Sequence, residues 1–144
     1  MIYFDTAYIL KCYIHEPGTP EVRSLLLQHR SAASCAIGRL EFATGVKRAI
    51  REGRLDPRTL NTIFAIFEED YQNGIWSWLP VTTHLIDAAV RAVHSLPSST
   101  FLRSADAMHI VCAREAGFSE IYSNDRHLTS AAPHFGIRAT NIIV

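Results

Sequence analysis

Residues 104–126, with the sequence SADAMHIVCAREAGFSEIYSNDR, predict a helix followed by a short buried strand. Apolar residues recur at helical spacing up to Gly117, and Ser104 is a suitable N-cap for this helix. Residues 120–123 then form the strand, and Asp125 follows it almost directly. Short strands that alternate with helices are typical of an α/β domain with a mostly parallel sheet.

The same alternation continues on the N-terminal side and beyond residue 126. Further strands are expected at residues 1–5, 32–36, 75–79 and 137–142. Further helices are expected at about residues 6–15, 20–29, 40–53, 57–73 and 83–94, with Thr6, Asp56 and either Thr82 or Thr83 as N-caps. A length of 144 residues without repeats or linkers is typical of one domain. We therefore expect a single α/β domain over residues 1–144.

The composition excludes several classes of protein. Apolar residues make up 48% of the chain, and 14 Lys and Arg are balanced by 14 Asp and Glu. A disordered chain would be less apolar, and no apolar run approaches the roughly 18 residues of a membrane-spanning helix. The N-terminus lacks the features of a signal peptide and the three cysteines are scattered, so we expect a cytoplasmic protein with reduced thiols. Zero net charge argues against nucleic-acid binding by bulk charge alone, so such a function needs a local site.

Four acidic residues lie where a parallel sheet forms its functional sites. Asp5 ends the first expected strand, and Asp125 follows the strand expected at residues 120–123. Glu41 and Asp106 lie in the early turns of two expected helices. Sites in such sheets form beyond the carboxyl ends of the strands, so we expect these carboxylates to converge. Asp5 is wedged between apolar segments, where a carboxylate is costly unless it binds a cation or accepts backbone N–H bonds at the next helix start.

Convergent carboxylates repel one another and would take up protons unless a cation lies between them. Carboxylate and water ligands, without a cluster of Cys or His, suit Mg²⁺ or Mn²⁺. Such an ion can orient a water molecule and stabilise charge on a phosphodiester. The pattern therefore indicates metal-dependent phosphodiester hydrolysis.

These motifs together resemble the PIN-domain ribonucleases, and in length and motif order the VapC-like toxins of bacterial toxin–antitoxin modules. The resemblance rests on the opening IYFDTA, on Leu40-Glu41, on residues 105–109 (ADAMH) and on residues 122–126 (YSNDR). It implies an α/β/α sandwich, Mg²⁺- or Mn²⁺-dependent endoribonuclease activity, a cognate antitoxin and often a homodimer. It also implies that Asp5, Glu41, Asp106 and Asp125 are the catalytic and metal-binding residues, with Thr6 and Ser123 as small polar residues beside them.

Basic residues near the carboxylates are candidates for substrate binding. Arg39, Arg103 and Arg126 adjoin the acids in sequence, and they could hold phosphates or pair with the acids. Residues 47–58 carry five basic side chains against two acidic ones, which either dock RNA phosphates or form an ordinary solvated helix face. His109 shares a helix face with one of the carboxylates, so it is either a general acid or a packed, hydrogen-bonded histidine.

Two alternatives to the ribonuclease stay open. The chain could be a non-catalytic RNA- or partner-binding module that keeps a relic acidic site. It could also be a phosphatase or a nuclease of another fold, although residues 5–7 lack the Asp-x-Asp of the haloacid-dehalogenase phosphatases. The sequence favours a Mg²⁺- or Mn²⁺-dependent endoribonuclease, with RNA as substrate and an antitoxin as partner.

Overall fold

A computed structural model describes residues 1–143, and its strands are short and parallel. The strands are β1 (Ile2–Tyr3), β2 (Ala32–Cys35), β3 (Trp76–Leu79), β4 (Glu120–Tyr122) and β5 (Arg138–Thr140). In space β1, β2 and β3 form one sheet in this order, and β4 pairs with β5. A parallel bridge between Phe4 and Tyr122 joins the two sheets, so that β1 lies between β2 and β4.

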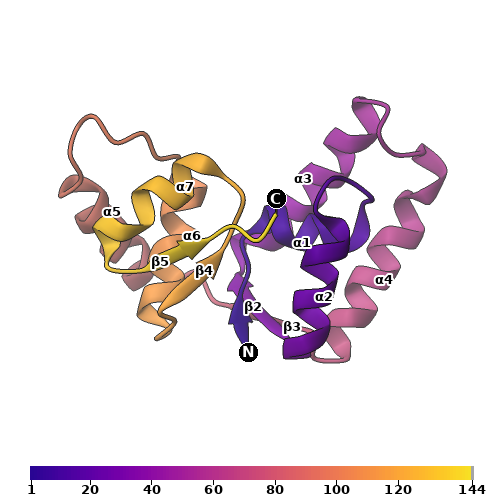
Figure 1. Cartoon of the computed structure of the whole chain (residues 1–144), viewed down its shortest axis with the longest axis horizontal. Helices are drawn as coiled ribbons and strands as arrows, with labels where there is room; N and C mark the ends of the chain where they lie inside the picture. Colours follow the sequence, from indigo (N-terminus) through magenta and orange to yellow (C-terminus); the bar gives the residue numbers. More distant parts are fainter. Residues whose placement is uncertain (144) are drawn as a thin grey trace.

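Helices cover both faces of these strands (Figure 1). They are α1 (Thr6–Tyr13), α2 (Thr19–His29), α3 (Ile37–Arg51), α4 (Leu60–Gln72), α5 (Thr83–His94), α6 (Ser104–Glu115) and α7 (Arg126–Ala131), with short 3₁₀ turns η1 (Pro57–Thr59) and η2 (Ala132–Phe135). In Figure 1, α5, α6 and α7 lie to the left of β1 and α2, α3 and α4 to its right. The predicted three-layer α/β/α architecture with a parallel sheet is confirmed.

Strand alternation divides the core into two clusters. Tyr3 packs with residues of α5, α6 and α7, whereas Ile2 and Phe4 pack with residues of α1, α3 and α4. This division follows from the two-residue period of β1, which sends successive side chains to opposite faces. In the second cluster the rings of Phe42 and Phe67 stack at 3.8 Å between centroids and are tilted by only 11°. Both faces of β1 are thus buried, which holds Asp5 at its end in a fixed position.

Three details differ from the sequence prediction. Thr6 was expected to cap α1, but Asp5 does so because the strand ends earlier and its carboxylate accepts the N–H of Tyr8. Ser104 was expected to cap α6, but it is the first helical residue, and Arg103 takes the cap position without a side-chain cap bond. No helix was expected between Asp125 and the last strand, but residues 126–135 form α7 and η2, and the Asp125 side chain accepts two backbone N–H bonds at the start of α7.

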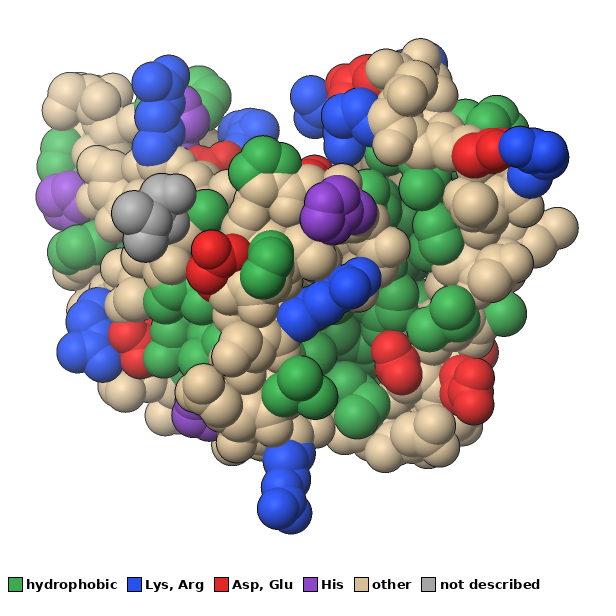
Figure 2. Space-filling model, turned by 45° about the vertical axis from the view of Figure 1, so that its right-hand side comes forward, with side chains coloured by type: hydrophobic (Ala, Val, Ile, Leu, Met, Phe, Trp, Pro, Cys, Tyr) green, Lys and Arg blue, Asp and Glu red, His purple; other side chains and the backbone are tan. Residues whose placement is uncertain are grey.

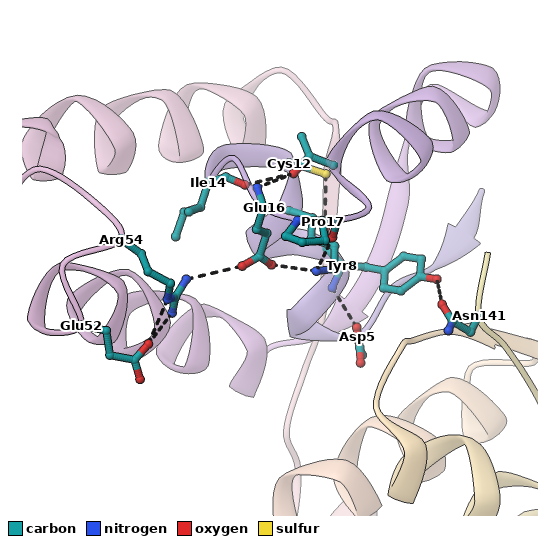
Figure 3. Close-up of polar contacts among 11 residues, drawn as sticks. Asp5, Tyr8, Cys12, Ile14, Glu16, Pro17, Glu52, Arg54 and Asn141 are labelled. Atoms are coloured by element: carbon teal, nitrogen blue, oxygen red, sulfur yellow. Dashed lines mark hydrogen bonds and ion pairs between the residues drawn. The ribbon is translucent and has the colours of Figure 1, made fainter. Parts of the chain in front are cut away.

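Polar contacts join α1 to the C-terminal segment, and the end of α3 to the connection between α1 and α2 (Figure 3). The Tyr8 hydroxyl donates to Asn141 Oδ1 at 3.1 Å and thereby fixes the C-terminal segment beside α1. Arg54, just beyond the end of α3, reaches both Glu52 at 2.8 Å and Glu16 at 3.5 Å. Among the described residues no helix combines the length and apolar character needed to cross a membrane.

Candidate active site

The four acidic residues singled out in the sequence line one cavity of about 130 Å³. Asp5 caps α1 at the end of β1, Glu41 lies in α3, Asp106 lies in the first turn of α6, and Asp125 caps α7. The other lining residues are Thr6, Ala7, Arg103 and His109. Parallel strands bring their carboxyl ends to one edge, which is why segments far apart in the sequence meet here.

Asp5 is the most deeply buried of the four carboxylates, with 4% of its surface exposed. Its Oδ1 accepts the N–H of Tyr8 at 2.9 Å, and its Oδ2 accepts the hydroxyl of Ser123. Burial raises the pKa of Asp5 from its ordinary 3.8 to about 6, although these two hydrogen bonds work in the opposite direction. Ionising Asp5 in the fold therefore costs free energy, and a bound cation would remove this cost.

Glu41 is held by two donors. The Thr6 hydroxyl donates to Glu41 Oε2 at 2.7 Å, and His109 Nε2 lies 2.7 Å from the same oxygen. Burial alone would raise the pKa of Glu41, but the hydrogen bonds and the charge of His109 outweigh it, and the pKa is lowered. Glu41 is therefore kept ionised and fixed in orientation.

His109 is buried, with 1% of its surface exposed, and both ring nitrogens have partners. Nε2 faces Glu41, and Nδ1 lies 3.1 Å from the hydroxyl of Tyr3. That hydroxyl also accepts the N–H of Cys35 at 2.9 Å, which fixes it in place. Burial lowers the pKa of His109, but Glu41 outweighs burial and raises it. His109 is thus packed and hydrogen-bonded, and it also lines the carboxylate cavity.

Arg103 bridges the other two carboxylates. Its Nε donates to Asp106 Oδ2 at 2.9 Å, and its Nη2 donates to Asp125 Oδ2 at 2.5 Å. Burial raises the pKa of Asp125, but the N–H groups of α7 and the charge of Arg103 outweigh it and lower the pKa. One guanidinium therefore supplies the positive charge that two of the acids require.

The donor set of the cavity suits a divalent cation of the Mg²⁺ type. All four acids are carboxylates, and hard cations prefer oxygen ligands. Within residues 1–143, however, no three Asp, Glu, His or Cys side chains already surround a single point. The four acids have the ligand chemistry that a divalent metal prefers. Two of them contact Arg103 instead, and metal binding requires that these contacts rearrange.

Comparison with protein-family models identifies the PIN domain over residues 2–132. The chain belongs to the PIN-domain family. A search of curated proteins finds no match. The fold resembles solved structures that include FitAcB from Neisseria gonorrhoeae, with a TM-score of 0.71 and 17% identity over 98% of this chain and 97% of that chain.

Two further solved structures share the PIN fold with this chain. VapBC2 from Rickettsia felis, bound to a DNA fragment from the VapBC2 promoter, matches with a TM-score of 0.69 and 13% identity over 98% of each chain. FitAB bound to the IR36 DNA fragment matches with a TM-score of 0.70 and 17% identity over 98% of this chain and 94% of that chain. The resemblance seen in the motifs is thus confirmed for the fold.

The PIN domain does not bring every candidate residue into its cavity. Thr6 and Arg103 line it, and Ser123 lies behind Asp5, to which it donates. Arg39 instead lies over the ring of Tyr71, with 5.4 Å between its guanidinium carbon and the ring centroid. Arg126 is the exposed first residue of α7 and is not part of the lining.

Sequence reasoning missed Tyr3, which orients His109 from β1. A signal was present, because a buried tyrosine hydroxyl needs a hydrogen-bond partner and β1 is otherwise apolar. The identity of that partner was not readable, since Tyr3 and His109 are 106 positions apart in the chain.

Proposed function

We propose that this PIN domain, spanning residues 1–144, is a Mg²⁺- or Mn²⁺-dependent endoribonuclease that hydrolyses RNA phosphodiester bonds. One observation carries the proposal: four carboxylates from four separate segments line a single cavity in a chain of the PIN family. Acids dispersed in sequence and gathered in space are what metal-dependent phosphodiester hydrolysis requires.

Asp5 and Asp106 are the proposed direct metal ligands, and Glu41 and Asp125 would bind directly or through water. When bound, the ion supplies a lowered pKa for a coordinated water and positive charge beside the phosphodiester. Asp5 suits this role because it is buried, fixed by two donors and carries a raised pKa.

The surrounding side chains keep the carboxylates ready. Thr6 and His109 hold Glu41 as an ionised acceptor, which can orient an attacking water and accept its proton. Ser123 holds Asp5 and also accepts the N–H of Asp125 at 3.0 Å, so it links two of the acids. Arg103 is 58% exposed in its side chain, and its Nη1, which makes neither of the bonds to Asp106 and Asp125, can contact a phosphate of the substrate.

We further propose that the chain is a cytoplasmic toxin, paired with an antitoxin and forming a homodimer. The support is the likeness in fold to chains of the FitAB and VapBC2 complexes. Exposed apolar side chains on α5, among them Val90 and Val93, offer surface for such contacts. The competing function, a non-catalytic RNA- or partner-binding module, predicts binding without turnover.

The test is cleavage of single-stranded RNA by the purified chain. We expect cleavage with Mg²⁺ or Mn²⁺, none with chelator, and recovery when the metal is restored. Asp106→Asn should abolish cleavage while circular dichroism shows an unchanged fold. Asp87→Asn is the matched control, because Asp87 is an exposed carboxylate on α5 outside the cavity, and it should retain full activity.

Cleavage that persists in Asp106→Asn, or that is indifferent to chelator, would refute the metal mechanism. For the toxin proposal, expression in a bacterial host should arrest growth with the native chain and not with Asp5→Asn. Growth arrest by both proteins would contradict a catalytic toxin.

A further inference from the structure

A second cavity, of about 380 Å³, adjoins the carboxylate cavity on the side of α3. Its lining residues are Thr6, Ala7, Leu10, Glu41, Thr44, Gly45, Arg48 and Arg51. The first two and Glu41 line both cavities, so the two lie side by side. We call the second cavity the α3 groove. A polymer with one bond in the carboxylate cavity would have to leave it through an opening of this kind.

The α3 groove follows one face of a helix. Glu41, Thr44, Arg48 and Arg51 are spaced by three or four positions, so they form a stripe along α3. The ten positions from Glu41 to Arg51 span about 15 Å of helix. The stripe therefore leads from a carboxylate of the candidate active site to two arginines farther along the helix.

The five basic residues of the segment 47–58 differ in their acidic partners and in whether they line the groove. Arg54 is engaged by Glu52 and Glu16 (Figure 3), and Arg58 pairs with Asp56 at 2.6 Å. The remaining three are Lys47, Arg48 and Arg51, of which only the two arginines line the groove.

The two groove arginines can still bind an anion. Arg48 donates to Glu52 at 2.7 Å through Nε, and within residues 1–143 its two terminal nitrogens make no hydrogen bond. Arg51 is exposed, and in the same part of the chain it makes no ion pair. In Figure 2 the upper outline of the molecule is notched, and Lys and Arg side chains stand on both sides of the notch.

The floor of the α3 groove is apolar. Ala7 and Leu10 of α1 meet Gly45 of α3 there, and a Cβ atom placed on Gly45 would lie 2.6 Å from Leu10 Cδ1. The missing side chain at Gly45 thus allows the two helices to pack closely. An apolar floor beneath an arginine rim matches a single strand, whose sugars and bases pack on apolar surface while its phosphates contact cations.

We infer that the α3 groove is the path of single-stranded RNA beside the cleavage site, with phosphates of the strand at Arg48 and Arg51. The inference rests on the proposed ribonuclease function and adds the direction in which the substrate leaves the carboxylates. Arg48 and Arg51 are substrate-binding residues in this assignment, with Arg48 nearer to Glu41.

Binding at equilibrium tests this path separately from cleavage. A fluorescent single-stranded RNA is titrated in the Asp5→Asn background with chelator over a range of salt concentrations. Removing one arginine that neutralises a phosphate should reduce the slope of log affinity against log salt by about 0.7. We expect this reduction for Arg51→Ala and about twice as much for the double variant Arg48→Ala/Arg51→Ala. Lys47→Ala, an equal charge change on α3 outside the groove lining, should leave the slope nearly unchanged.

An unchanged slope in the double variant would overturn the proposed path. So would an equal reduction in Lys47→Ala, because it would indicate the general charge of α3 and not a groove. If the double variant kept its RNA slope but bound an acidic peptide more weakly, the groove would be a protein-docking surface and the inference would be wrong. Absence of metal-dependent cleavage by the native chain would refute the ribonuclease proposal on its own, whatever the binding slopes show.

Discussion

Replacing Asp5 by Asn should stabilise the metal-free protein at neutral pH, although Asp5 is proposed as a catalytic residue. The pKa of Asp5 lies at about 6 in the fold against an ordinary 3.8, with burial as the main cause. Since one pKa unit corresponds to about 1.4 kcal/mol, ionising Asp5 in the fold costs on the order of 3 kcal/mol at neutral pH. Asn has nearly the same shape and no charge, but it has one acceptor oxygen, so the Ser123 hydroxyl that donates to Asp5 Oδ2 would have to turn and accept from the amide nitrogen. We expect a net gain of about 1–3 kcal/mol.

The pH dependence follows from the same pKa. Between about pH 4 and pH 6 the folded chain binds more protons at Asp5 than the unfolded chain, so raising the pH through this window destabilises the native protein. Asp5→Asn lacks this titration. The stability advantage of Asp5→Asn should therefore be smallest at pH 4 and below, grow by about 3 kcal/mol through this window, and level off above pH 6. Other titrating groups are common to both proteins and cancel in the difference.

Urea unfolding in chelator, followed by tryptophan fluorescence at several pH values, measures this difference. Asp87→Asn is the control, since it neutralises an exposed carboxylate and should change stability by less than about 0.5 kcal/mol. Added Mn²⁺ should stabilise the native protein and have little effect on Asp5→Asn, because a ligand stabilises only the state that binds it. A less stable Asp5→Asn at pH 7, or a difference that is the same at pH 4 and pH 7, would refute this reasoning.

Three other substitutions test separate parts of the structure. Arg103→Ala should raise the affinity for Mn²⁺ several-fold in calorimetry, because the guanidinium competes with the metal for two carboxylates, and an unchanged affinity would contradict this competition. Phe42→Ala should cost about 3–5 kcal/mol in urea unfolding, since Phe42 is fully buried and stacked on Phe67, and a cost below about 1 kcal/mol would be inconsistent with that packing. Thr82→Ala should cost about 1 kcal/mol because it removes the cap bond to the N–H of Leu85 at 3.1 Å, whereas Thr82→Ser should retain most of it.

Much of the fold was predictable because its signals are local. The helical period of residues 104–117 and the turn at Gly117 depend only on neighbours in the chain, and both match α6 and its end. The placement of Asp5 and Asp125 at strand ends was predictable for the same reason. The N-caps of α1 and α6 were mispredicted by one residue, because adjacent polar residues compete for one cap and the exact end of the preceding segment decides between them.

The sequence by itself indicated the family and predicted which four acids converge, since periodicity and motif order are properties of a linear chain. Only the tertiary structure decided which polar groups hold those acids. Tyr3, His109 and Glu41 come from segments as much as 106 positions apart, and their hydrogen bonds exist only after the sheet and α6 have packed. The same holds for the arginines, because adjacency to an acid in the sequence does not predict which of them enters the cavity. Arg103 bridges two carboxylates there, whereas Arg39 lies on the ring of Tyr71. A long side chain takes its direction from the surface onto which its helix packs, and that surface is made by the rest of the chain.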